Sequence, residues 1–228
     1  EEHGAAFYRK YLGGSAMGAY YLLKQTPANA DPLGPENTLC LMTGVVVGAP
    51  VSGQSRVTAT AKSPETGLIG DAQAGGFWPA ELKFAGFDGI VVHGASETPV
   101  YLWIEDGEAQ LRDASHLWGR FTAEVEDAIR DEWDDQRVQV LQCGPAAERG
   151  VRFSALINYA NRANGRTGWR NGEQTTLRRR TSTAWGSSGR RRRFRPRTTW
   201  AGCRPGTGRA GCSRVPRRFR AGVCRIPY

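Results

Sequence analysis

The sequence lacks the features that would assign it to several common functional classes. No apolar run approaches the ~20 residues needed to span a bilayer, and no charged-then-apolar leader opens the chain. It contains no Walker phosphate-binding pattern, no strand-linked dinucleotide fingerprint, and no Ser/His/Asp or Cys/His spacing typical of nucleophilic catalysis. We therefore expect a soluble, cytoplasmic protein without a membrane segment.

Cysteine and histidine are too few and too scattered to form a metal motif. Two of the five cysteines lie in apolar surroundings and are expected to pack in the core, and the other three are too widely spaced for a CxxC pair. None of the three histidines has a second metal-type ligand at helical spacing, so a structural role is favoured for each. These residues are Cys40, Cys143, Cys203, Cys212, Cys224, His3, His93 and His116.

Charge divides the chain into two unlike parts. The 228 residues carry a net charge of +9. The segment from Trp169 to Tyr228 has 17 Arg, no Lys and one acidic residue, a net charge of +16, whereas residues 1–168 carry −7. We therefore expect a domain over residues 1–168 and an Arg-rich, low-complexity tail over 169–228. Because this tail lacks the periodicity and apolar content of a packed core, we expect it to be disordered.

Hydrophobic periodicity in the first part predicts many short strands and two or three helices. A short helix from Phe7, a glycine turn and a second helix from Ser15 come first, and an amphipathic helix over residues 121–133 comes later. Strands are predicted at 39–47, 56–62 (with one polar face), 89–93, 100–105, 109–112 and 138–142, followed by a short apolar segment at 153–157. Because strands and helices do not alternate strictly, the pattern favours the α+β class.

Two segments are suited to hold an anionic ligand. The first runs from Arg56 through a glycine-rich stretch to Gly76, and the second is Asn161–Gly168. Glycine lets the backbone approach a ligand and turn N–H groups toward it, and Arg offers a planar fork that matches phosphate oxygens. Composition alone leaves open the alternative that both segments are ordinary loops with solvated arginines.

Eight motifs, in order along the chain, carry a resemblance to a known family. They are residues 11–14, 31–37, 62–67, 75–86, 99–103, 111–119, 144–146 and 161–166; the most specific are Glu-Leu-Lys-Phe-Ala-Gly at 81–86 and Ala-Ser-His-Leu-Trp-Gly at 114–119. Over residues 8–168 the chain resembles the N-terminal, pterin-binding domain of the tungsten-dependent aldehyde:ferredoxin oxidoreductases. The resemblance implies two packed β-sheets with a few helices, which form a saddle for one side of a tungsten bis-pterin cofactor (tungstopterin).

The resemblance also implies the residues of the cofactor site. It assigns pterin contacts to Arg56 and Gly75, and a second binding loop to Arg162, Ala163, Gly165 and Arg166. Backbone carbonyls of Gln73 and Ala163 would help to bind a Mg²⁺ that joins the two pterin phosphates. Gln73 stands where the family usually has Asn, a change that a backbone contact tolerates.

At the level of function, the resemblance implies a fragment of an enzyme that oxidises small aldehydes to carboxylic acids and passes electrons to ferredoxin through a [4Fe–4S] cluster. The family's cluster cysteines and proton-transfer groups lie beyond the matching region, so this chain is expected to lack both. The resemblance leaves open the choice between tungsten and molybdenum, and it leaves a homodimer open.

After Gly168 the chain departs from the family pattern. Codons that can encode residues 169–179, moved by one or two bases, give Gly-Ala-Met-Gly-Ser and Leu-Lys-Ala, which resemble the family's continuation. The hypothesis is therefore that the tail is a frameshifted reading. The alternative is a non-catalytic binding module with a basic arm for nucleic acid, in which Arg190–Arg197 with Phe194 would neutralise phosphates and stack on bases.

Overall fold

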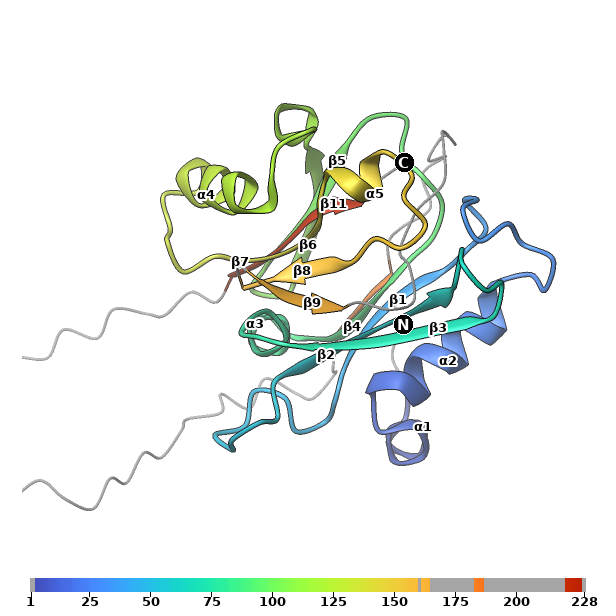
Figure 1. Cartoon of the computed structure of the whole chain (residues 1–228). Helices are drawn as coiled ribbons and strands as arrows, with labels where there is room; N and C mark the ends of the chain where they lie inside the picture. The colour runs from blue at the N-terminus through green and yellow to red at the C-terminus, as the bar shows by residue number, and fades with distance from the viewer. Residues whose placement is uncertain (1–2, 160, 165–182, 187–219, 227–228) are drawn as a thin grey trace, which may run out of the picture.

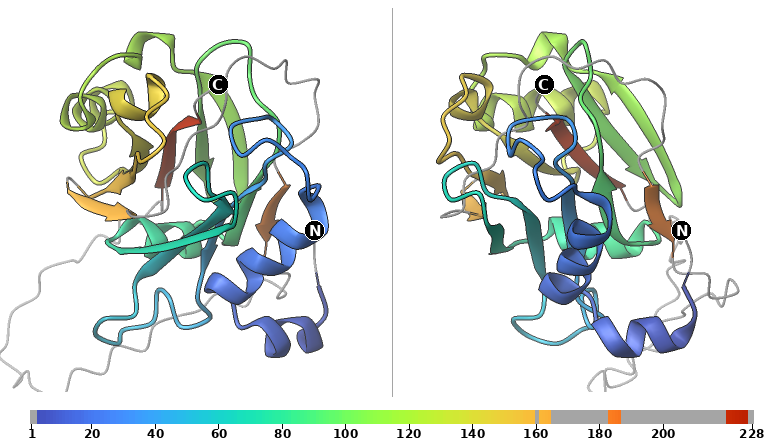
Figure 2. Two further views of the ribbon diagram at one scale, coloured as in Figure 1. Left: turned by 45° about the vertical axis from the view of Figure 1, so that its right-hand side comes forward. Right: turned by 90° about the vertical axis from the view of Figure 1, so that its right-hand side faces the viewer.

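The computed structural model describes residues 3–159, 161–164, 183–186 and 220–226. It contains two β-sheets that face each other across a shared core (Figures 1 and 2). The first sheet has the order β10-β4-β1-β2-β3 and the second the order β6-β5-β11-β7-β8-β9. The predicted α+β class with two packed sheets is therefore confirmed.

The first sheet is built from β1 (Leu39–Thr43), β2 (Arg56–Lys62), β3 (Ile69–Gly75), β4 (Phe87–Val92) and β10 (Thr183–Gly186). The second is built from β5 (Val100–Glu105), β6 (Glu108–Asp113), β7 (Gln139–Cys143), β8 (Leu156–Asn158), β9 (Arg162–Asn164) and β11 (Arg220–Ile226). The described helices are α1 (Ala5–Tyr11), α2 (Gly14–Gln25), α3 (Trp78–Phe84), α4 (Thr122–Glu132), α5 (Pro145–Glu148) and a 3₁₀ turn at Ser115–Leu117.

Apolar side chains bind these elements into layers. The largest cluster lies between the sheets and includes Trp78 and Leu82 of α3, both fully buried. Helices α1 and α2 cover the outer face of the first sheet, and α4 covers the outer face of the second (Figure 1). Cys40 and Cys143 are both buried, which confirms their predicted packing role, and burial raises the pKa of the Cys40 thiol to about 12.

Strand β2 matches its predicted bounds and has the predicted polar face, but this face is buried. Val57 and Ala59 face the central core, whereas Thr58 and Thr60 face α2 and are also buried. The approach is close because α2 presents glycine at this point: a Cβ on Gly18 would lie 2.4 Å from the Thr60 hydroxyl oxygen. The polar face of β2 is therefore a helix-packing surface.

No strand was predicted in the glycine-rich stretch after β2, but the structure places strand β3 there. It pairs with β2 in antiparallel register from Lys62–Ile69 to Arg56–Gly75. Helix α3 was also missed, because it is short and begins at a Pro-containing turn. The hairpin β5–β6 was predicted correctly, and β1 ends four residues before its predicted end, because the chain turns at residues 45–50.

Most of the tail, residues 169–228, for which disorder was predicted, lies outside the described residues. Two segments within it are described, β10 and β11; β10 pairs with β4, and β11 lies between β5 and β7. At these two places the extended chain is held by backbone pairing, which does not require the apolar periodicity of a core strand. No helix of the described residues is long and apolar enough to cross a membrane.

Lowering the pH is expected to destabilise the fold through His93. Its Nδ1 lies 3.1 Å from the Thr38 hydroxyl oxygen, and burial lowers the pKa of His93 below its ordinary 6.5. The unfolded chain therefore takes up this proton first, and the free energy of unfolding decreases as the pH falls through 6.5 toward the pKa of the folded state. Urea unfolding across this range should show a flatter pH dependence for His93→Gln; curves that stay parallel would contradict the assignment.

Candidate functional site

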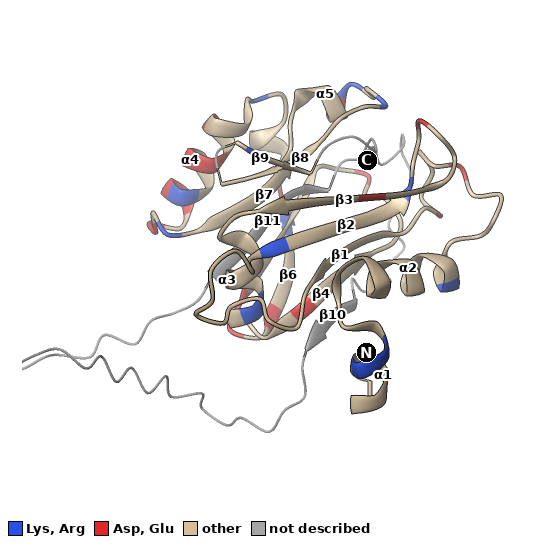
Figure 3. Cartoon of the chain, turned by 60° about the horizontal axis from the view of Figure 1, so that its bottom comes forward, with Lys and Arg blue, Asp and Glu red and all other residues tan. Residues whose placement is uncertain are grey.

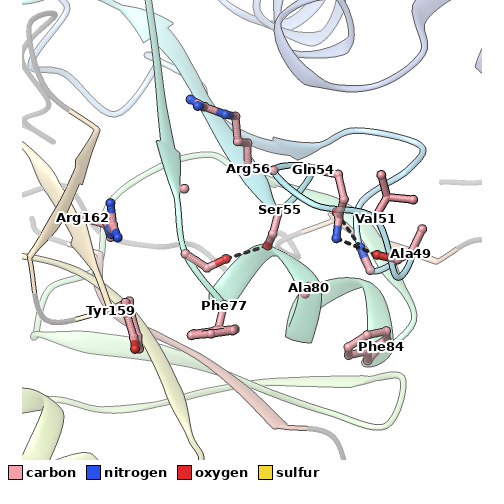
Figure 4. A pocket seen from close by; sticks show the side chains of 14 residues that line it. Ala49, Val51, Gln54, Ser55, Arg56, Phe77, Ala80, Phe84, Tyr159 and Arg162 are labelled. Atoms are coloured by element: carbon pink, nitrogen blue, oxygen red, sulfur yellow. Dashed lines mark hydrogen bonds between the residues drawn. The ribbon is translucent and has the colours of Figure 1, made fainter. Parts of the chain in front are cut away.

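A cleft opens where the start of β2, the end of β3 and the turn into β9 come together. Its volume is about 650 Å³. In Figure 4, Tyr159 and Arg162 lie on one side, Ala49, Val51 and Gln54 on the other, and Phe77, Ala80 and Phe84 along the base. The full lining comprises Gly48, Ala49, Val51, Gly53, Gln54, Ser55, Arg56, Gly75, Gly76, Phe77, Ala80, Phe84, Tyr159 and Arg162.

The first wall is the end of the β2–β3 pair. Arg56 is the first residue of β2 and lies directly opposite Gly75, the last residue of β3. The hydroxyl of Ser55 donates a hydrogen bond of 2.6 Å to the carbonyl oxygen of Gly76, which ties the two strand ends together. The local register therefore places the Arg56 side chain and the Gly75–Gly76 backbone at one edge of the cleft.

The second wall comes from the β8–β9 hairpin, about one hundred residues later. Asn164 is fully buried, and its amide donates to the carbonyl oxygens of Val57 (3.2 Å) and Ala72 (3.0 Å) in the first sheet. These bonds fix β9 against β2 and β3. They bring Arg162, two residues earlier on β9, into the cleft that Arg56 lines.

Asn158 supports the same junction from β8. It is 1% exposed, and its amide nitrogen donates to the carbonyl oxygen of Arg162 at 3.4 Å. Its Oδ1 lies against Gly76, so that a Cβ added to Gly76 would be only 1.9 Å from this oxygen. The oxygen has no hydrogen-bond partner among the described residues. The carboxamide thus occupies the space that only glycine leaves free at position 76.

The charge of the cleft is positive. Arg56 and Arg162 are the charged residues of its lining, and within the described part of the chain neither guanidinium has an ion-pair or hydrogen-bond partner. The start of β2 is accordingly basic in Figure 3. Two unpaired guanidinium forks beside a glycine backbone are suited to bind a phosphorylated anion.

The loop between β1 and β2 forms the third wall and is braced by a side chain. Gln54 accepts a hydrogen bond from the Gly48 N–H (3.0 Å) and donates one to the Ala49 carbonyl oxygen (2.8 Å). Val51 at the tip of this loop is exposed, as is Phe84 on α3. The cleft therefore combines a small number of polar anchors with apolar walls, the usual composition of a cofactor site.

The structure brings together three of the seven residues that the resemblance assigned to the site: Arg56, Gly75 and Arg162. The side chain of Gln73 is not in the cleft lining and donates instead to the Ser15 hydroxyl at 3.4 Å. Ala163 is also absent from the lining and pairs with Ile157 in the β8–β9 hairpin. Gly165 and Arg166 lie outside the described residues.

Several lining residues were missed from the sequence. Phe77 follows the Gly75–Gly76 pair, and Tyr159 precedes the second Arg-containing segment. An aromatic residue beside each predicted anion-binding segment was therefore the sequence signal that could have identified these two lining residues. Nothing in the sequence indicated Ser55 or Asn158, because their contacts depend on how distant segments meet. The histidines have protein partners: His93 contacts Thr38, His3 contacts Tyr21, and His116 lies 3.4 Å from Glu132.

Comparison with known proteins gives consistent matches over the same region. Residues 1–170 match the family described as aldehyde ferredoxin oxidoreductase, N-terminal domain. The tungsten-containing aldehyde ferredoxin oxidoreductase of Thermococcus kodakarensis is 45% identical over 168 residues, which are 74% of this chain and 28% of that protein. The protein of the same name from Pyrococcus abyssi is 43% identical over 168 residues, with the same shares covered.

Among solved structures, the active site complex BamBC of benzoyl coenzyme A reductase, in complex with 1,5-dienoyl-CoA, has a similar fold. The TM-score is 0.70 and the sequence identity 34%, covering 73% of this chain and 25% of that chain. The chain thus spans a little over a quarter of the length of the curated relatives that it matches.

Proposed function

Since this chain belongs to the aldehyde ferredoxin oxidoreductase family, we propose that it forms the cofactor-binding part of a tungsten enzyme. The whole enzyme would oxidise an aldehyde, with water, to a carboxylic acid and pass the two electrons to ferredoxin. Because the chain spans 28% of its curated relatives, the remaining parts of the reaction belong to regions outside it.

One observation carries this proposal: Arg56 and Arg162, from segments about one hundred residues apart, line a single cleft together with Gly75 and Gly76. The cleft fits a pterin cofactor in three respects. Its charge is positive, its guanidinium groups are unpaired within the described residues, and its glycine edge lets a ligand approach the backbone.

We assign the phosphate-holding role to Arg56, Arg162 and the Gly75 backbone, with Gly165 and Arg166 as further contacts from the second loop. Backbone carbonyls of Gln73 and Ala163 would provide oxygen ligands for a Mg²⁺ joining the pterin phosphates, since Mg²⁺ takes few protein oxygens beside phosphate. When bound, the tungsten–pterin group would accept the electrons of the aldehyde, and a [4Fe–4S] cluster held by other regions would relay them.

The residues of this chain would bind and orient the cofactor. The two guanidinium groups would neutralise phosphate charge with little rearrangement of the backbone, because Asn164 and Ser55 already hold the strands that carry them. The apolar side chains of Val51 and Phe84 would contact the bound group from the lining of the cleft.

We propose a domain boundary near Gly168, in line with the end of the family match at residue 170. The alternative of a nucleic-acid-binding module gains no support, because the family match ends at residue 170, at the start of the Arg-rich tail, and Arg190–Arg197 lies outside the described residues.

The test is a binding measurement with the 228-residue chain. A 6-hydroxymethylpterin phosphate is titrated while its fluorescence is followed, and the unphosphorylated pterin is titrated in parallel. The phosphorylated compound is expected to bind at least about tenfold more tightly, because one charge-assisted contact contributes about 1.5–3 kcal/mol. Equal or undetectable binding of the two compounds would overturn the proposal.

A further inference from the structure

We infer that Phe77 and Tyr159 form an aromatic wall that receives the flat pterin ring, while Arg56 and Arg162 hold the phosphate of the same ligand. The inference rests on the proposed function and assigns two further binding residues to the same cleft.

The two rings are exposed inside a concave, positively charged site. Phe77 is 55% exposed and Tyr159 is 42% exposed, and their ring centroids are 4.8 Å apart in an edge-to-face arrangement. Figure 4 shows Tyr159 below Arg162 and Phe77 beside it, on the base of the cleft. Heteroaromatic rings stack well on such side chains, and every such ring offers a π-face for the contact.

Backbone conformation gives a second reason to assign a role to Tyr159. Its φ of 45° lies in the left-handed region, which bulky residues adopt only at a cost in free energy. The turn itself does not need this side chain, because glycine or asparagine would form it with less strain. A large aromatic residue held in a strained turn at the cleft edge is therefore consistent with a binding role.

Exposure alone does not make an aromatic residue part of this wall. Phe153 is 60% exposed but does not line the cleft, and Phe121 is 71% exposed on the N-terminal side of α4. Phe77 and Tyr159 differ from them because unpaired guanidinium groups stand beside them. A ligand that matches the cleft must therefore carry a flat ring and a phosphate on one molecule, as a pterin phosphate does.

The test separates ring binding from phosphate binding in the 228-residue chain. Tyr159→Gly and Phe77→Leu remove one ring each, Tyr159→Phe keeps the ring, and Phe153→Leu is the matched control outside the cleft. Each variant is titrated with 6-hydroxymethylpterin phosphate by fluorescence and with inorganic pyrophosphate by calorimetry.

Loss of either ring is expected to weaken the pterin phosphate about tenfold, the size of one stacking contact, and to leave pyrophosphate affinity within about twofold. Tyr159→Phe and Phe153→Leu should bind as the unchanged chain does. Glycine adopts positive φ without strain, so the Tyr159→Gly variant should unfold at a temperature no lower than that of the unchanged chain. A loss of binding in this variant then cannot be attributed to a loss of folding.

The outcomes distinguish the inference from the proposed function. If the unchanged chain binds the pterin phosphate and both ring deletions bind it equally well, the aromatic wall is refuted while the proposed function stands. If the unchanged chain does not bind it, the proposed function fails first. Guanosine monophosphate is the competing ring-and-phosphate ligand, and binding as tight as that of the pterin would overturn the assignment to pterin.

Discussion

Replacing both Arg56 and Arg162 by alanine is expected to reduce the affinity of the 228-residue chain for pyrophosphate by a factor of a hundred or more. A hydrogen bond from a charged group contributes about 1.5–3 kcal/mol, so each single replacement should cost roughly ten- to a hundredfold. Both side chains are exposed and lack partners among the described residues, so their loss should leave the fold intact. Isothermal titration with pyrophosphate at low and high salt measures the effect.

The matched control for this double replacement is Arg152→Ala, which removes an exposed arginine outside the cleft lining. It should change pyrophosphate affinity by less than about twofold, because a charge separated from the ligand by solvent is screened. Arg56→Lys and Arg162→Lys should give intermediate losses, since lysine keeps the charge but not the planar fork. Equal losses for the double replacement and for Arg152→Ala would mean that the cleft contributes only general positive charge.

The same two arginines show how much of the site could be predicted from the sequence. Local chemistry alone left Arg56 and Arg162 as candidates, with solvated loops as the alternative. The family resemblance, which the comparisons confirm, assigned them to one site. The bonds that bring them together, from Asn164 to Val57 and Ala72, join residues 107 and 92 positions apart. Such contacts leave no periodic signal, so neither Asn164 nor Asn158 could be recognised.

Secondary structure was predictable wherever one physical preference dominated. Strand β2 alternates small and β-branched residues and was predicted to its exact bounds. Strand β3, Ile-Gly-Asp-Ala-Gln-Ala-Gly, carries two glycines and little apolar surface, and its pairing with β2 overrides a weak local preference. A tertiary contact also favours small side chains in β3, because the buried amide of Asn164 must approach the strand to bind the Ala72 carbonyl oxygen.

Gly76→Ala is expected to destabilise the fold by about 3 kcal/mol, from overpacking together with backbone strain. An added Cβ would lie 1.9 Å from Asn158 Oδ1 and 3.0 Å from its Cγ, and φ at this position is 150°. Asn158 cannot swing away, because it is buried and its amide is bound to the Arg162 carbonyl oxygen. Thermal unfolding should show a decrease on the order of 10 °C for a domain of this size.

A second replacement tests whether the clash with Asn158 is the cause of this loss. Gly67→Ala is the matched control, since Gly67 has a φ of 69° but open space around its Cβ position, and should cost only the backbone strain, about 1 kcal/mol. Combining Gly76→Ala with Asn158→Ala removes the obstructing carboxamide, so the double variant should be more stable than the sum of the two single losses by about 1–2 kcal/mol. Strict additivity of the two losses would show that Asn158 does not fill the space beside Gly76.

In the same double variant, pyrophosphate affinity should stay reduced although the clash is relieved. The reason is that the Asn158 amide no longer holds the carbonyl oxygen of Arg162 beside the cleft.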